Sequence, residues 1–314
     1  MRNLLFTFIL ALVSVLTSAQ TFSNVAIAEA STVCSIAQDE QGMVWLGTEG
    51  GLYSYDGYRT IPHNTAADGT VVATRIHSML VSHNIIYMGT ERGLLVYDIR
   101  SGRYGQPQGQ SPKDIRAVTL HQGRLWMGSA TGLYSCDLKT NNILPENRQL
   151  HNVYSLLSTP RGLLVGTIDG LALRSPGGSV RRIPIGNGPQ PLVNALAPDR
   201  GTHAVWIGTE GALYRYDWRT FQPVAPLMGN SIKSLALHGD NIYAGTDNGM
   251  FIYNKVSNHI SHALHDSRSA RSIANNIVWA VYNDRWGNLW AGTDQGVSEI
   301  QRRPFYTYTP LSDI

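Results

Sequence analysis

A short hydrophobic pattern centred on one glycine recurs seven times along the chain. In each copy two apolar residues, the first of them aromatic in six copies, precede a Gly that is followed by Thr or Ser. The repeat glycines are Gly47, Gly89, Gly128, Gly166, Gly208, Gly245 and Gly292, with successive spacings of 42, 39, 38, 42, 37 and 47 residues. Self-similarity at about 40 residues is typical of repeat proteins, and a β-rich repeat of that length usually forms one four-stranded blade.

Another apolar residue follows each repeat glycine at a fixed interval of five residues: Leu52, Leu94, Leu133, Leu171, Leu213, Met250 and Val297. In six copies the residue before it is a second glycine, as at Gly51, whereas the fifth copy has Ala212 there and Gly211 one place earlier. A constant interval predicts a tight hairpin in which the second glycine takes φ > 0. The turn of the fifth copy is expected to differ.

An apolar pair with a spacing of three residues precedes each repeat glycine. The pairs are Val33/Ile36, Ile76/Met79, Ile115/Val118, Val153/Leu156, Val193/Leu196, Ile232/Leu235 and Ile277/Ala280. Residues three apart lie on opposite faces of a strand, so this strand is apolar on both faces and is expected to be sandwiched between neighbouring blades. Together the patterns predict an all-β chain folded as a single seven-bladed β-propeller with four antiparallel strands per blade.

The segment Phe22 to Ile27 also reads as a strand, but it belongs to no repeat. We expect this N-terminal strand to close the propeller by pairing outside Val297 to Ile300 in the last blade, because that pairing removes an exposed edge. The aromatic residues before the repeat glycines, such as Trp45, are expected to pack between blades rather than to bind a ligand.

Composition adds limits on function and location. The chain has 314 residues, 43% of them hydrophobic, and a formal net charge of +3 at pH 7, which suits one large domain. No basic run is present, so nucleic acid is not expected as a partner. Arg2 followed by the apolar run Leu4 to Leu16 predicts a signal peptide over residues 1–19, with an uncleaved membrane anchor as the alternative. The expected organisation continues with a propeller over 20–303 and a tail over 304–314.

The two cysteines, Cys34 and Cys136, fall in repeats that are not adjacent. A disulfide between them is therefore not expected, and both are interpreted as small buried thiols. Their spacing matches neither a metal site nor a redox motif, so no metal or cofactor is predicted.

The candidate binding site comes from one position compared across the repeats. The residue after the first apolar residue of the inner strand is Cys34, His77, Arg116, Tyr154, Asn194, Lys233 and Val278. The candidate ligand-binding residues are the five polar members of this series, together with a nearby tryptophan: His77, Arg116, Tyr154, Asn194, Lys233 and Trp279. Such a ring suits a polyhydroxylated ligand, which the tryptophan could stack against. The alternative is that these side chains satisfy backbone groups or water in the central channel, and that Trp279 only packs.

The repeat also resembles a known family. Gly-Thr followed by Gly-Leu and Tyr-Asp, with Asp39 and Gly42 ahead of Trp45, is similar to the two-component-regulator propeller repeat. The stretches 51–58, 272–279 and 304–308 resemble the N-terminal periplasmic propeller of Bacteroidetes hybrid two-component sensors. The resemblance implies sensing of glycan breakdown products in the periplasm of a Gram-negative bacterium, with the signal passed through a membrane to a histidine kinase. Those sensors continue into a second propeller and a kinase, so the chain is expected to be a fragment or a stand-alone propeller.

Three functions follow as hypotheses. The first is a non-catalytic, ligand-sensing propeller, with an oligosaccharide ligand and a second propeller or a membrane-anchored kinase as partners. The second is an interaction propeller of an outer-membrane type IX secretion assembly. The third is a polysaccharide lyase or glycosidase, for which His77, Arg116 and Tyr154 would have to supply the chemistry. The acidic residues favour the first hypothesis, since most of them, such as Asp39 and Asp247, fall in turns where turn chemistry explains them.

Overall fold

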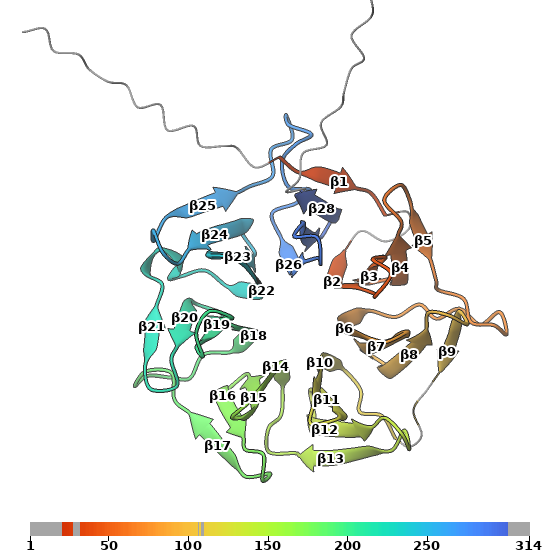
Figure 1. Ribbon diagram of the computed structural model, residues 1–314, viewed down its shortest axis with the longest axis horizontal. Helices are drawn as coiled ribbons and strands as arrows, with labels where there is room; N and C mark the ends of the chain where they lie inside the picture. Colours follow the sequence, from red (N-terminus) through yellow and green to blue (C-terminus); the bar gives the residue numbers. More distant parts are fainter. Residues whose placement is uncertain (1–20, 28–31, 106, 108–109, 301–314) are drawn as a thin grey trace, which may run out of the picture.

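The computed structural model describes residues 21–300 except 28–31, 106, 108 and 109. In this part of the chain seven four-stranded sheets surround a central axis (Figure 1). Neighbouring strands in each sheet pair antiparallel. The seven-bladed propeller predicted from the repeat glycines is therefore confirmed.

Six blades run in sequence order from an inner strand near the axis to an outer strand at the rim (Figure 1). They are β2 (Val33–Gln38), β3 (Val44–Thr48), β4 (Gly51–Tyr55), β5 (Thr60–Pro62); β6 (Ile76–Ser82), β7 (Ile85–Thr90), β8 (Gly93–Asp98), β9 (Arg103–Gly105); β10 (Ile115–His121), β11 (Arg124–Ser129), β12 (Gly132–Asp137), β13 (Ile143–Asn147); β14 (Val153–Thr159), β15 (Gly162–Thr167), β16 (Gly170–Arg174), β17 (Val180–Ile183); β18 (Val193–Pro198), β19 (Val205–Thr209), β20 (Leu213–Tyr216), β21 (Phe221–Pro223); and β22 (Ile232–His238), β23 (Asn241–Thr246), β24 (Met250–Asn254), β25 (Ile260–Ala263). A short 3-10 helix, Ala225–Leu227, follows β21.

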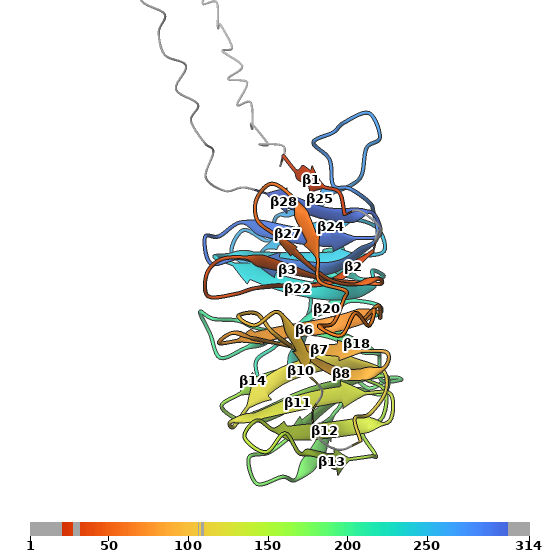
Figure 2. The same ribbon diagram turned by 90° about the vertical axis from the view of Figure 1, so that its right-hand side faces the viewer.

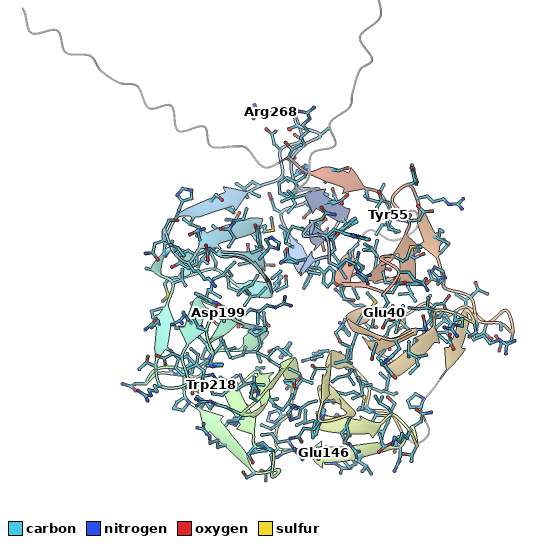
Figure 3. The ribbon with its side chains drawn as sticks, in the orientation of Figure 1. Glu40, Tyr55, Glu146, Asp199, Trp218 and Arg268 are labelled. Atoms are coloured by element: carbon cyan, nitrogen blue, oxygen red, sulfur yellow. The ribbon has the colours of Figure 1, made fainter. Side chains whose placement is uncertain are left out.

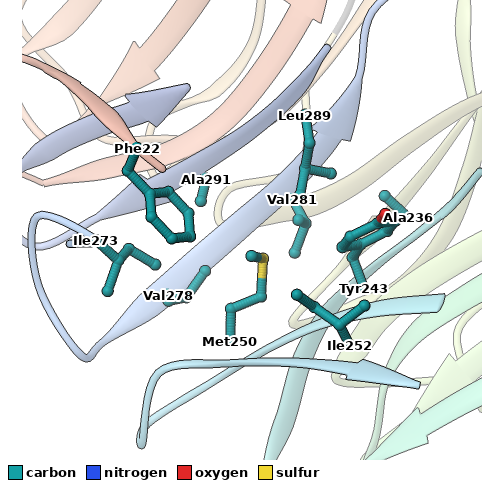
Figure 4. Packing of buried hydrophobic residues seen from close by; sticks show 10 residues of the cluster. All are labelled: Phe22, Ala236, Tyr243, Met250, Ile252, Ile273, Val278, Val281, Leu289 and Ala291. Carbon is teal, nitrogen blue, oxygen red and sulfur yellow. The ribbon is translucent and has the colours of Figure 1, made fainter. Parts of the chain in front are cut away.

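The seventh blade joins the two ends of the described chain. It consists of β26 (Val278–Asn283), β27 (Leu289–Thr293) and β28 (Gly296–Ile300), and β1 (Ser23–Val25) is its outermost strand. β1 pairs antiparallel with β28, from Ser23 opposite Glu299 to Val25 opposite Val297. The predicted closure by the N-terminal strand is confirmed, although the strand is shorter than predicted. Phe22 anchors it, because this side chain is 5% exposed and packs in a cluster with Ile273 (Figure 4).

The hairpin between the second and third strands of each blade follows the sequence pattern. In six blades the predicted glycine has positive φ, for example +126° at Gly51 and +85° at Gly296. The Thr or Ser after the repeat glycine accepts a backbone N–H within the turn and donates its hydroxyl to the carbonyl three residues ahead, as from Thr48 to Gly51 at 2.8 Å. In the fifth blade that carbonyl belongs to Ala212, and neither Gly211 nor Ala212 has positive φ. The different turn expected there is confirmed.

Contacts between blades explain why each repeat glycine must lack a side chain. A Cβ on Gly47 would lie 2.8 Å from Ile76 Cγ2, in the first residue of the next inner strand, and the same clash recurs around the ring. A Cβ on Gly292 would lie 2.7 Å from the carbonyl oxygen of Val33, which brings the seventh blade back to the first. Seven buried clusters fill the seven interfaces between blades. Trp45 lies in the cluster between the first and second blades, so its interblade packing is confirmed.

Several expectations concern other parts of the chain. The predicted signal peptide, the 304–314 tail and the resembling stretch 304–308 lie outside the described residues. Within the described residues, no helix is long and apolar enough to cross a membrane. Cys34 and Cys136 are both free, and the second of them is buried. The linker between β25 and β26 projects beyond the rim, where Arg268 lies (Figure 2, Figure 3).

Candidate functional site

One β-bulge near the start of each inner strand positions the candidate residues. In all seven blades the pairing register between the first and second strands shifts around the second residue of the inner strand, for example between Val33 and Ser35. A bulged residue has no direct partner in the ladder, and the local kink redirects its side chain. The bulged residues are Cys34, His77, Arg116, Tyr154, Asn194, Lys233 and Trp279, and all of them line one cavity at the axis.

The sequence alignment of the last blade was wrong by one residue. Val278, not Ile277, is the first residue of the inner strand, because Val278 pairs with Thr293 as Val33 pairs with Thr48. Val278 is fully buried between the sixth and seventh blades. Trp279 is therefore the seventh member of the ring, in the place given to Val278. The error arose because Ile277 and Val278 are both apolar.

The cavity has a volume of about 830 Å³, which is within the usual range for small-molecule sites. Its wall includes Arg75, Asp114, Glu210 and Asp247 besides the seven bulged residues. These four flank either the start of an inner strand or the hairpin after a second strand. These charged residues of the wall therefore lie toward the face that carries the blade-to-blade linkers.

Ion pairs connect much of the cavity wall. Lys233 Nζ lies 2.9 Å from Asp247 Oδ1, and Arg75 Nη1 lies 3.2 Å from Glu49 Oε1. Asp114 serves two neighbours, because Arg116 Nη2 is 2.6 Å from its Oδ2. His77 Nε2 lies 3.4 Å from the other oxygen, Oδ1, without forming a hydrogen bond to it. The cations of the ring are thus held by carboxylates of the protein itself.

Cations also lie over both aromatic rings of the site. Lys233 Nζ is 4.3 Å and Arg75 Cζ is 5.6 Å from the ring centroid of Trp279, whose indole Nε1–H donates to Asp294 Oδ1 at 2.5 Å. On the other side of the cavity Arg116 Cζ lies 4.4 Å from the ring centroid of Tyr154. Cation–π contacts and the indole hydrogen bond fix these rings in place.

Burial sets the protonation of two groups in the wall. Desolvation lowers the pKa of His77 below its usual value, with the opposing effect of Asp114 second, so this imidazole is neutral at pH 7. Desolvation raises the pKa of the Cys34 thiol, and nearby Arg75 opposes that effect. Cys34 is therefore a thiol rather than a thiolate at neutral pH, which makes it a weak nucleophile.

Several polar side chains of the wall have side-chain atoms without a hydrogen-bond partner among the described residues. The Tyr154 hydroxyl, the Asn194 amide and the Glu210 carboxylate form no hydrogen bond or ion pair with any described residue. His77 Nε2 and the hydroxyls of Ser78 and Ser234 also lack a hydrogen-bond partner, but these atoms are buried and therefore less accessible to a ligand than the other three groups. Among the described residues no three His, Cys, Asp or Glu side chains are grouped as metal ligands.

Sequence reasoning found the ring but missed the residues that hold it. Arg75 and Asp114 directly precede an inner strand, while Glu210 and Asp247 directly follow the hairpin Thr. The repeats did contain a sequence signal for these residues. The residue directly after the hairpin Thr or Ser is acidic in five copies: Glu49, Glu91, Glu210, Asp247 and Asp294. The sequence interpretation assigns such acids, Asp247 among them, to turn chemistry. The structure instead pairs three of them, Glu49, Asp247 and Asp294, with ring or flanking side chains.

Comparisons with known proteins agree with this geometry. The sequence profile of the two component regulator propeller matches residues 29–50 and 272–295, which contain the inner strands of the first and seventh blades. In both segments an aspartate organises the following turn. Asp39 and Asp284 each accept two backbone N–H groups and an indole N–H, from Trp45 at 2.9 Å and from Trp290 at 3.2 Å.

Solved structures extend the match to most of the chain. Two solved structures of the extracellular domain of BT4673 from B. thetaiotaomicron are 36% and 35% identical in sequence to this chain. BT4673 is described in one as a proposed one-component system and in the other as a proposed hybrid two-component system. The TM-score is 0.83, over 91% of this chain and 40% of that chain. The extracellular domain of BT3049, also a proposed hybrid two-component system from B. thetaiotaomicron, is 21% identical with a TM-score of 0.77, over 91% of this chain and 42% of that chain, and shows the fold alone. This chain thus spans about 40% of the length of these relatives. No curated protein matches the sequence.

Proposed function

The chain belongs to the two-component regulator propellers, and on that premise we propose that it is a non-catalytic sensor domain that binds a saccharide in the periplasm. The relatives support the sensor role and the location outside the cytoplasmic membrane, since their matching domains are extracellular parts of proposed two-component systems. The ligand class comes from the site.

One observation carries the proposal: seven blades each contribute one bulged side chain to a single cavity of about 830 Å³. A bulge at the same place in every blade leaves one residue of each inner strand without a cross-strand partner. This arrangement is expected where a fold presents side chains to a ligand. Hydroxyl, amide and carboxylate groups in the wall match a ligand rich in hydroxyls. The signal would pass to a second propeller or to a membrane-anchored kinase.

Thermal unfolding with a broad panel of oligosaccharides tests the proposal. A ligand that binds only the folded protein stabilises it by about 2.7 kcal/mol at a hundredfold excess over Kd, so a true ligand raises the melting temperature in proportion to the logarithm of its concentration. A panel of plant, fungal and host glycans that produced no rise would refute saccharide binding. Release of reducing or unsaturated sugar during the same incubation would instead favour the lyase or glycosidase.

A second function, protein interaction, is favoured by apolar side chains on the opposite face. Tyr58, Val256 and Trp286 are 94%, 71% and 55% exposed, and each lies in a turn at the other end of the strands from the cavity. Exposed aromatic residues are common in protein interfaces. Capture of one defined envelope protein by the wild-type chain, lost in the variant Trp286→Ser with saccharide binding unchanged, would support this function.

A further inference from the structure

We infer that the cavity binds a neutral saccharide rather than an acidic one, and that residues of the fourth and fifth blades make the contacts that recognise it. This inference rests on the proposed function, because it names the ligand class of the same site. Three permanent cations line the cavity, Arg75, Arg116 and Lys233, and each has a carboxylate of the protein within 3.2 Å. The positive charge of the wall is therefore already neutralised.

An acidic ligand would have to compete with these internal pairs. Asp114 lies beside both His77 and Arg116, so a uronate that approaches the Arg116 guanidinium also approaches a carboxylate. Asp247 is 57% exposed beside Lys233, and Glu210 adds a negative charge with no cation against it. A carboxylate of the ligand would be repelled by these carboxylates of the wall. If it displaced one of them from its cation, that internal carboxylate would lose its ion-pair partner. The electrostatics of the cavity therefore disfavour an anion.

The groups left free are those that bind hydroxyls. Asn194 supplies two amide donors and one acceptor, Glu210 supplies carboxylate acceptors, and Tyr154 can donate or accept. A hydrogen bond from a sugar hydroxyl to an ionised carboxylate is stronger than one between neutral groups. Together the three side chains offer donors and acceptors to sugar hydroxyls without any change in net charge.

The backbone holds these three groups close together. Glu210 follows β19 directly, and its N–H donates at 3.1 Å to the carbonyl of Leu192, two residues before Asn194. Tyr154 comes from β14, the inner strand packed beside β18, and its ring is fixed under Arg116. Residues held in this way lose little freedom on binding, which favours affinity. We name Tyr154, Asn194 and Glu210 the hydroxyl-binding arc.

Trp279 is not the stacking platform that its position in the ring suggests. Lys233 Nζ already lies over this ring at 4.3 Å, and Asp294 holds its indole N–H. A sugar stacked there would have to displace the ammonium from both the aromatic ring and Asp247. Recognition therefore falls to the hydroxyl-binding arc, on the other side of the cavity.

Calorimetric titration with matched ligands tests the inference. The probes are tri- to pentasaccharides from glucan, mannan and galactan, each as the neutral form and as its C6-oxidised uronate. We expect the neutral member of the binding pair to bind at least about tenfold more tightly, because the uronate brings uncompensated charge. Its affinity should change less than about twofold between low and high salt, since screening acts on charged pairs.

Two variants of the arc and two matched controls complete the design. Asn194→Ala and Glu210→Gln are each expected to weaken binding of the neutral saccharide by roughly tenfold or more, the usual effect of losing a hydrogen bond to a buried or charged group. Asn142→Ala and Glu40→Gln make the same chemical changes at exposed turns on the opposite face and should leave affinity unchanged. Melting temperatures of the four variants establish that each is folded.

The possible outcomes distinguish a failure of the neutral-ligand inference from a failure of the proposed saccharide-binding function. Tighter, salt-sensitive binding of the uronate forms would overturn the neutral-ligand inference while saccharide sensing survived. Binding of neutral forms that neither arc variant weakened would overturn the assignment to the fourth and fifth blades. If no member of any pair bound, the proposed function itself would be wrong. Tighter neutral binding that both arc variants weaken supports the inference.

Discussion

The substitution Gly292→Ala tests whether the seventh and first blades are in contact. A Cβ at this position would lie 2.7 Å from the carbonyl oxygen of Val33 and 2.9 Å from its Cγ1. Contacts under about 3 Å cannot be relieved by a rotamer change when the obstacle is backbone, so the two blades must move apart. Overpacking of this kind costs about 1–3 kcal/mol.

Thermal and urea unfolding measure that cost. Each kcal/mol shifts the melting temperature of a domain of this size by about 2–4 °C, so we expect a decrease of roughly 2–12 °C. Gly211→Ala is the matched control, because this glycine has no positive φ and a Cβ there meets nothing within 4 Å. It should be neutral or slightly stabilising, by about 0.4–1 kcal/mol at most.

A second glycine separates ring closure from ordinary interface packing. At Gly128, within the ring, a Cβ would lie 2.3 Å from Val153 Cγ1 in the next blade, so Gly128→Ala should also destabilise. If Gly128→Ala lowered the melting temperature and Gly292→Ala left it unchanged, the last blade would not meet the first. The closed ring, and with it the cavity at the axis, would then be refuted.

Three further predictions concern stability. Phe22→Ala should cost about 3–5 kcal/mol, because it empties a buried position that anchors the closing strand; a loss under about 1 kcal/mol would contradict that role. Asp39→Ala should cost roughly 2–4 kcal/mol in urea unfolding by stranding two backbone donors and the Trp45 indole, and an unchanged midpoint would show that the turn needs no carboxylate. Desolvation lowers the pKa of His63 and of His77 below the usual value of about 6.5, so the unfolded chain takes up protons that the folded chain resists. The contribution of these two histidines to the free energy of unfolding should therefore be fully present above about pH 6.5 and decrease as the pH falls toward 5. A free energy of unfolding that rose as the pH fell over that range would contradict the lowered pKa values.

The architecture was predictable because each blade repeats one physical constraint. Gly47 and its six equivalents permit close contact with the next blade, and Gly51 and most of its equivalents permit φ > 0, so both leave a regular mark in the sequence. The closing strand was predictable for a related reason, since Phe22 to Ile27 had no repeat of its own to pair with.

The site was predictable only in part. The ring position followed from the repeat, but the bulge that places Cys34 and its equivalents in the cavity leaves no distinct sequence signal. In the seventh blade two adjacent apolar residues hid the register. The pairing of Arg116 with Asp114, and of Lys233 with Trp279, depends on how side chains of neighbouring strands meet, which a one-dimensional pattern does not contain. For that reason the sequence predicted a polar ring but not which of its members are free.

Protection of Cys34 gives the most direct test of the central claim, that the cavity at the axis holds the ligand. This partly buried thiol lines the cavity, whereas Cys136 is buried in the cluster between the second and third blades and serves as an internal reference. At an alkaline pH, where part of the Cys34 thiol ionises, the tightest-binding neutral saccharide should slow alkylation of Cys34 in proportion to its calorimetric occupancy and leave Cys136 unaffected. Unchanged alkylation of Cys34 at saturating saccharide would place the ligand elsewhere and contradict the account.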